Sequence, residues 1–195
     1  MDVQFTTTLD EVKKNLRVFK TAPEYTIVEN FRRIEDALKA EINELCSWVT
    51  DTAEDGVWKI DPAKVPRTKA RMLVRSIFAF IEGIVYSMKQ VALSADRLQN
   101  MLTEQEKEQM KSDKLHHFLP NVRLAFDVLG KAFELSCELN TNCTGWNRMA
   151  QSVKLRNRLT HPKCPADLEL TDQELGWSIE AYSWFVAQVQ GVVAV

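Results

Sequence analysis

The sequence predicts an all-α protein, an up-and-down bundle of five to seven helices in a single domain spanning residues 1–195. Apolar residues recur at three- and four-residue spacing in at least five long segments, which is the pattern of amphipathic helices. The chain also has only six Gly and six Pro, too few for the many tight turns of an all-β fold. With 45% hydrophobic and 27% charged residues, it has the composition of a soluble protein with one sizeable core.

Two helices are expected before residue 66. A capping box over residues 8–11 indicates the start of the first, and Pro23 either ends that helix or opens the next. The second is predicted over residues 24–49, where apolar side chains follow helical spacing. Residues 51–66 contain one Gly and two Pro and are predicted to form a loop, in which residues 57–60 are a short extended piece.

The central helix is predicted over residues 68–99. Its apolar face is wide, which indicates burial on more than one side. Its longest apolar run, residues 77–88, is too short to span a bilayer and contains Glu82. Across the whole chain, we expect the following large side chains to be mostly buried: Ile77, Phe80, Ile84, Phe126, Leu129, Leu155 and Leu159.

Four further helices should follow. The charged segment 102–114 predicts a short surface helix, and Pro120 is expected to open a helix that continues to about residue 139. The next helix is predicted over residues 146–160 and is followed by a proline-containing loop. Thr171 and Glu174 have nearly the pattern of a capping box, which indicates the start of the last helix.

Charge and composition narrow the possible functions. The formal net charge of −2 argues against broad coating of nucleic acid, which needs a basic surface, but it leaves room for a local basic cleft. The four cysteines include no C-x-x-C pair, so we expect reduced thiols, and a zinc site built from the cysteines with His116 and His117 is the disfavoured alternative. We expect no metal and no other cofactor. The chain starts without a basic segment followed by an apolar run, which predicts a cytoplasmic protein with no membrane association.

Three chemically capable side chains, Arg156, Asn157 and His161, lie together at the end of the helix predicted over residues 146–160. A residue before proline is pushed out of the α region, so Pro162 should end the helix at Thr160 or His161. Guanidinium and imidazole groups can hold a phosphate and move a proton near neutral pH. The same residues also fit an ordinary helix C-terminus followed by a stop signal.

A helical wheel places these polar residues on the continuation of one apolar face. That face is expected to hold Trp146, Met149, Ala150 and Val153 first, and then Asn157 and Thr160, with Arg156 at its edge. Leu155 and Leu159 form a separate stripe, and Arg158 points about 200° away from Arg156. If the mixed face meets a second copy of the chain, two sets of polar residues converge on one cleft.

The spacing Arg156-Asn157-x-x-x-His161 resembles the R-x4-H signature of the HEPN family. The resemblance covers residues 66–195, and residues 1–65 are less diagnostic. It implies a homodimer whose motif helices face each other, and a toxin or defence RNase that cuts RNA without a metal. Arg156 would bind the scissile phosphate, Asn157 would orient the phosphate or the histidine, and His161 would act as general base or acid on the ribose 2′-OH. The products would be a 2′,3′-cyclic phosphate and a 5′-OH.

Two residues are candidates for a supporting role, Thr160 and Glu82. Glu82 sits at the edge of an apolar face, where it either pairs with Arg156 or Arg75 or stays solvated. The rival interpretation is a non-catalytic HEPN-like bundle that binds a partner or a nucleotide, for example beside a nucleotidyltransferase. The net charge of −2 favours this rival, whereas an RNase would have RNA as substrate and an antitoxin as a possible partner.

Overall fold

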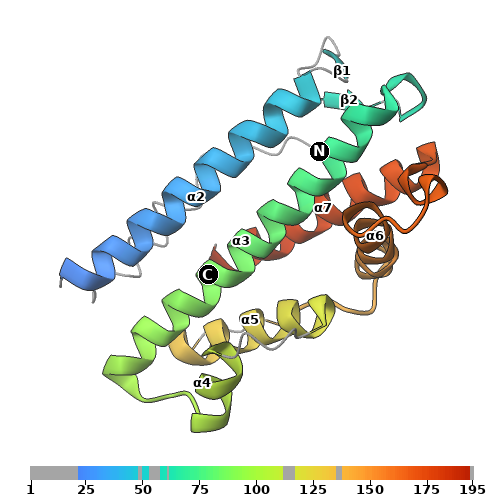
Figure 1. Cartoon of the computed structure of the whole chain (residues 1–195). Helices are drawn as coiled ribbons and strands as arrows, with labels where there is room; N and C mark the ends of the chain where they lie inside the picture. Colours follow the sequence, from blue (N-terminus) through green and yellow to red (C-terminus); the bar gives the residue numbers. More distant parts are fainter. Residues whose placement is uncertain are drawn as a thin grey trace. The chain divides into compact units, whose positions relative to one another are not determined.

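A computed structural model describes residues 22–47, 50–52, 58–60, 62–111, 117–134 and 138–193, and this part of the chain is mainly helical (Figure 1). The all-α prediction is confirmed for these residues. Their α-helices are α2 (Ala22–Ser47), α3 (Arg67–Gln99), α4 (Glu104–Lys111), α5 (Phe118–Phe133), α6 (Thr144–Thr160) and α7 (Asp172–Val193). The capping box predicted over residues 8–11 lies outside the described residues.

The connection between α2 and α3 contains a small antiparallel ladder, β1 (Thr50–Thr52) with β2 (Trp58–Ile60), in which Thr50 lies opposite Ile60. The extended piece expected at residues 57–60 is confirmed for residues 58–60, and residue 57 lies outside the described residues. Two 3-10 helices complete the described elements: η2 (Pro62–Lys64) precedes α3, and η3 (Pro165–Leu168) connects α6 to α7.

The helix predicted over residues 120–139 is wrong at both ends, because α5 begins at Phe118 and ends at Phe133. Glu134 adopts a left-handed conformation with φ of 54°, and its N–H donates to the carbonyls of Gly130 and Lys131. This conformation closes the helix. Pro120 lies in the first turn, where the N–H that proline lacks has no helical partner in any case.

Contacts within the chain group it into two compact units, and α2, α3 and α7 contribute to both. The first unit contains Glu35–Ile81 and Thr141–Phe185. In its core, the Phe80 ring packs edge-on against Tyr182 and Phe185, with centroid distances of 5.3 and 6.5 Å. Other fully buried side chains of this unit are Leu73, Val74, Ile77, Phe78, Ile81, Met149, Leu159 and Leu175.

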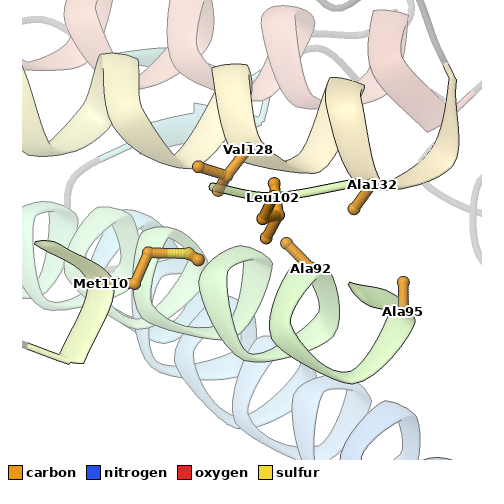
Figure 2. Close-up of a cluster of buried hydrophobic side chains, with 6 residues drawn as sticks. All are labelled: Ala92, Ala95, Leu102, Met110, Val128 and Ala132. Carbon is orange, nitrogen blue, oxygen red and sulfur yellow. The ribbon is translucent and has the colours of Figure 1, made fainter. Parts of the chain in front are cut away.

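The second unit includes Glu82–Asn140 and the end of α7. Figure 2 shows its apolar cluster, in which α3, α4, α5 and the turn before α4 contribute Ala92, Ala95, Leu102, Met110, Val128 and Ala132. Three of these six residues are alanines, and their small side chains allow close helix packing. Met110 is buried, so the charged surface helix α4 is anchored by one apolar side chain. All of the predicted core residues are buried except Leu129, which is only partly buried.

One segment within α3, Arg67–Asp96, is long and apolar enough to cross a membrane by length and composition alone. Its most apolar stretch is 61% buried inside the protein, as in the core helix of a soluble domain. This feature is weak support for a membrane role.

Asp96 connects the end of α3 to α4 within the second unit. Its Oδ1 accepts a hydrogen bond from the N–H of Leu102 at 2.6 Å, and its Oδ2 pairs with Lys107 Nζ at 2.9 Å. Burial disfavours the charged carboxylate, but the bonds from Lys107 and Leu102 outweigh burial and hold the pKa of Asp96 below its ordinary value. A lowered carboxyl pKa stabilises the fold above the unfolded-state pKa, and this contribution is lost as pH falls through the folded-state pKa.

We therefore expect Asp96→Asn to lower stability at pH 7 and to flatten the loss of stability below about pH 4, the ordinary range of an aspartate pKa. Urea unfolding at several pH values measures this. Glu104→Gln is the matched control, because Glu104 also contacts Lys107 but its side chain is 87% exposed. Equal pH dependence of wild type and Asp96→Asn would contradict the expectation.

Candidate functional site

The motif helix α6 ends at Thr160, where the proline rule placed its end. His161 leaves the helix with φ of −126° and ψ of 59°, and its N–H still donates to the carbonyl of Asn157 at 3.0 Å. The His161 side chain is exposed, and within the described part of the chain its imidazole has no hydrogen bond or ion pair. A ligand can therefore reach this imidazole without breaking an internal bond.

Arg156 and Asn157 lie one turn before His161 and contact each other. Arg156 Nη1 donates to Asn157 Oδ1 at 3.1 Å, so the amide oxygen helps to orient the guanidinium. Thr160 Oγ1 donates to the carbonyl of Arg156 at 2.7 Å. Asn157, Thr160 and His161 are exposed and Arg156 is half-buried, so the three predicted site residues and Thr160 share one solvent-facing helix end.

The face of α6 that packs into the protein differs from the wheel prediction. Its buried side chains are Trp146, Met149, Ser152, Leu155 and Leu159. The buried stripe thus runs through the two leucines, which were predicted to form a separate stripe, and does not continue through Asn157 and Thr160. Ser152 is fully buried although it is polar, so an apolar pattern assigns it to no packed face and misses the stripe that runs from Met149 through Ser152 to Leu155 and Leu159.

This geometry also corrects the surface expected for a dimer. Trp146 and Met149 are 8% and 0% exposed within a single chain, so the protein's own residues already cover them. Val153, on the same predicted face, is only half-buried, and Asn157 and His161 are exposed. These side chains are the ones available to a second copy, and the homodimer itself stays a prediction.

Arg158 is turned away from the motif. Its Nη2 donates to Glu174 Oε1 at 2.8 Å and to the carbonyl of Glu169 at 2.9 Å. Glu174 also forms the predicted capping box with Thr171: its Oε2 accepts from the Thr171 N–H at 2.9 Å, and its own N–H donates to Thr171 Oγ1 at 3.2 Å. Arg158 therefore ties α6 to the start of α7, which agrees with its predicted direction.

A row of arginines on α3 also contacts the end of the motif helix and the segment after it. Arg67, Arg71 and Arg75 are four residues apart and share one helix face. Arg75 Nη2 donates to the carbonyl of Leu159 at 2.7 Å, Arg71 Nη1 to the carbonyl of Leu168 at 3.2 Å, and Arg67 Nη1 to Asp172 Oδ1 at 2.7 Å. In the sequence these residues form the repeat R-x3-R-x3-R. We call Arg67, Arg71 and Arg75 the arginine row.

Glu82, the other supporting candidate, is exposed and lies in the second compact unit. Its pairing with Arg156 or Arg75 stays a prediction. Cys143 and Cys164 are free thiols, and the side chains of Cys46 and Cys137 lie outside the described part. Among the described residues, no three His, Cys, Asp or Glu side chains form a group that can hold a metal ion.

The position of α6 depends on a close contact at its first turn. The Trp146 and Trp184 rings pack edge-on with centroids 5.7 Å apart, and the backbone of Gly145 lies against the Trp184 side chain. A Cβ at Gly145 would overlap the Trp184 indole. This glycine therefore lets α6 and α7 approach closely.

We expect Gly145→Ala to lower the free energy of unfolding by about 1–3 kcal/mol, the usual cost of overpacking. Gly176→Ala on α7 is the matched control, because its added Cβ meets nothing within 4 Å. Alanine at this open helical site should stabilise the protein by about 0.5–1 kcal/mol. Urea unfolding of both variants measures the difference, and equal effects would show that the contact with Trp184 is not tight.

No protein-family model matches this chain, and no curated protein and no solved structure matches it either. The chemistry of the site therefore follows from its own residues. They provide a half-buried guanidinium, an amide that orients it and an exposed imidazole, all at one helix end. This set can bind a phosphodiester and transfer protons to or from it.

Proposed function

We propose that the chain is a metal-independent endoribonuclease of the HEPN type that acts in the cytoplasm as a toxin or defence RNase. The observation that carries the proposal is the shared, solvent-facing position of Arg156, Asn157 and His161 at the end of α6. At this end the backbone N–H of His161 binds the carbonyl of Asn157, and the guanidinium of Arg75 binds the carbonyl of Leu159. The imidazole of His161 has no hydrogen bond within the described residues, which weakens the alternative that the motif is only a helix stop.

In the proposed reaction, the ribose 2′-OH supplies the nucleophile. His161 removes its proton while the 2′-oxygen attacks the phosphorus, and Arg156 stabilises the charge that develops on the phosphate oxygens. The bond from phosphorus to the 5′-oxygen then breaks, and that oxygen must gain a proton. One histidine cannot be base and acid in the same step, so the proposal includes a homodimer in which the second copy's motif supplies the acid.

Incubation of the purified chain with mixed RNA, with and without a chelator, tests this proposal. We expect fragments that end in a 2′,3′-cyclic phosphate and begin with a 5′-OH, and an equal rate in the presence of EDTA. The reason is that the nucleophile comes from RNA and the charge stabilisation from Arg156, so no step calls on a metal. Fragments with a 5′-phosphate, or cleavage that stops with EDTA, would contradict the mechanism.

One observation favours the rival, a non-catalytic bundle that binds a protein partner or nucleotide beside a nucleotidyltransferase. The formal net charge of −2 is unusual for a protein whose substrate is a polyanion. Binding of a nucleotide or RNA with no cleavage at any protein concentration would favour this rival. Cleavage that an accompanying antitoxin suppresses would favour the RNase.

A further inference from the structure

The guanidinium of Arg75 lies at the open end of the motif helix. The last carbonyls of an α-helix point out of its C-terminus, and Arg75 binds one of them, that of Leu159, at 2.7 Å. It is therefore beside the point where His161 leaves α6, although the two residues are 86 positions apart in the sequence. Arg71 lies one turn earlier on α3 and binds the carbonyl of Leu168 at the end of η3.

The arginine row is neutralised unequally. Arg67 is paired with the Asp172 carboxylate, whereas Arg71 and Arg75 bind backbone carbonyls, which carry no formal charge. Of two nearby carboxylates, Glu174 pairs with Arg158. Asp167 accepts from the N–H groups of Lys163 and Cys164, which hold its pKa below the ordinary value, so it stays ionised and offsets one positive charge. Arg71 and Arg75 have no ion pair within the described residues, and both contribute positive charge to this part of the surface.

Electrostatics at a helix end make this charge important for the proposed RNase. The C-terminus of a helix carries about half a negative elementary charge, which repels a phosphate. A motif that binds RNA there needs cations over the last carbonyls, and Arg75 is placed to cover them. One carbonyl engages one of the five N–H donors of a guanidinium, so most of its donors can bind a second acceptor.

We propose that Arg71 and Arg75 bind the RNA backbone at phosphates next to the scissile one. The inference rests on the proposed function and extends its site from α6 onto α3. The two arginines hold substrate and take no part in proton transfer. The RNA strand then runs from the end of α6 along the arginine row. Lys163, in the connection between α6 and η3, is exposed.

The test measures binding of a single-stranded RNA oligonucleotide to the full chain carrying His161→Ala, by fluorescence anisotropy at several salt concentrations. Arg75→Gln keeps a donor for the Leu159 carbonyl but removes the charge. We expect it to weaken binding on the order of fivefold to tenfold and to reduce the slope of log affinity against log salt by about 0.7, the value for one lost phosphate contact on a single strand. Arg75→Lys should keep most of the slope.

Arg67→Gln is the matched control, because it removes a guanidinium from the same face that Asp172 already neutralises. Arg71→Gln is a second test that leaves the bond to Leu159 intact. Suppose that the unmodified chain binds and cuts RNA, but that Arg71→Gln and Arg75→Gln change the salt slope no more than Arg67→Gln does. The arginine row is then structural, and this inference alone is wrong. If the unmodified chain neither binds nor cuts RNA, the proposed function falls and the inference falls with it.

Discussion

His161→Ala is expected to abolish detectable RNA cleavage while leaving the free energy of unfolding within about 0.5 kcal/mol of wild type. Proton transfer by a positioned side chain contributes about 10²- to 10⁴-fold to a rate, so its loss takes slow cleavage below detection. The stability should hold because the imidazole is exposed and has no hydrogen bond or ion pair with the rest of the described chain. Cleavage of labelled RNA and urea unfolding of the same preparation measure both effects.

His117→Ala is the matched control for this substitution. Like His161, His117 is exposed and flanks a helix, and its side chain forms no capping bond to α5. It differs in lying away from Arg156 and Asn157 in the sequence. It should change neither cleavage nor stability. If His161→Ala cuts RNA as well as His117→Ala does, His161 is not the catalytic base and the site proposed at the end of α6 is wrong. If neither the unmodified chain nor His117→Ala cuts RNA, the non-catalytic bundle takes the place of the nuclease.

Local chemistry made much of the fold predictable. The end of α6 follows from the steric effect of Pro162 on His161, and the start of α7 follows from the reciprocal bonds of Thr171 and Glu174. Both depend only on residues within one helical turn. The helices α2 and α3 are also predictable, because their apolar residues keep a three- and four-residue spacing over a long segment, so that single exceptions have little effect.

Three features could not be predicted from local sequence patterns: the end of α5, the packed face of α6 and the contacts of the arginine row. The end of α5 depends on Glu134 in a left-handed conformation, which residues other than glycine seldom adopt. The packed face of α6 does not follow from its apolar pattern, because the polar residue Ser152 is fully buried and its hydroxyl has no partner within the described residues. The arginine row connects residues about 84–105 positions apart in sequence, so only the fold brings it to the motif.

Arg156→Ala and Arg158→Ala should separate catalysis from stability, although the two arginines are only two residues apart. Loss of Arg156 removes the group proposed to stabilise the phosphate, and we expect cleavage to fall by at least about 10²-fold, as for other charge-stabilising donors. Loss of Arg158 removes the bonds to Glu174 and the Glu169 carbonyl, so stability should fall by about 0.5–2 kcal/mol while cleavage of the folded protein stays near wild type.

Cleavage assays well below the unfolding midpoint, beside urea unfolding, resolve the two effects. Arg156→Lys adds a test of geometry: lysine keeps the charge but lacks the planar fork of donors, so it should restore only part of the activity. If Arg156 also pairs with Glu82, a double-mutant cycle with Glu82→Gln will show a coupling energy in stability. Equal loss of cleavage in Arg156→Ala and Arg158→Ala would mean that the end of α6 acts through its fold, because the contacts of Arg158 with α7 leave it no direct role at the phosphate.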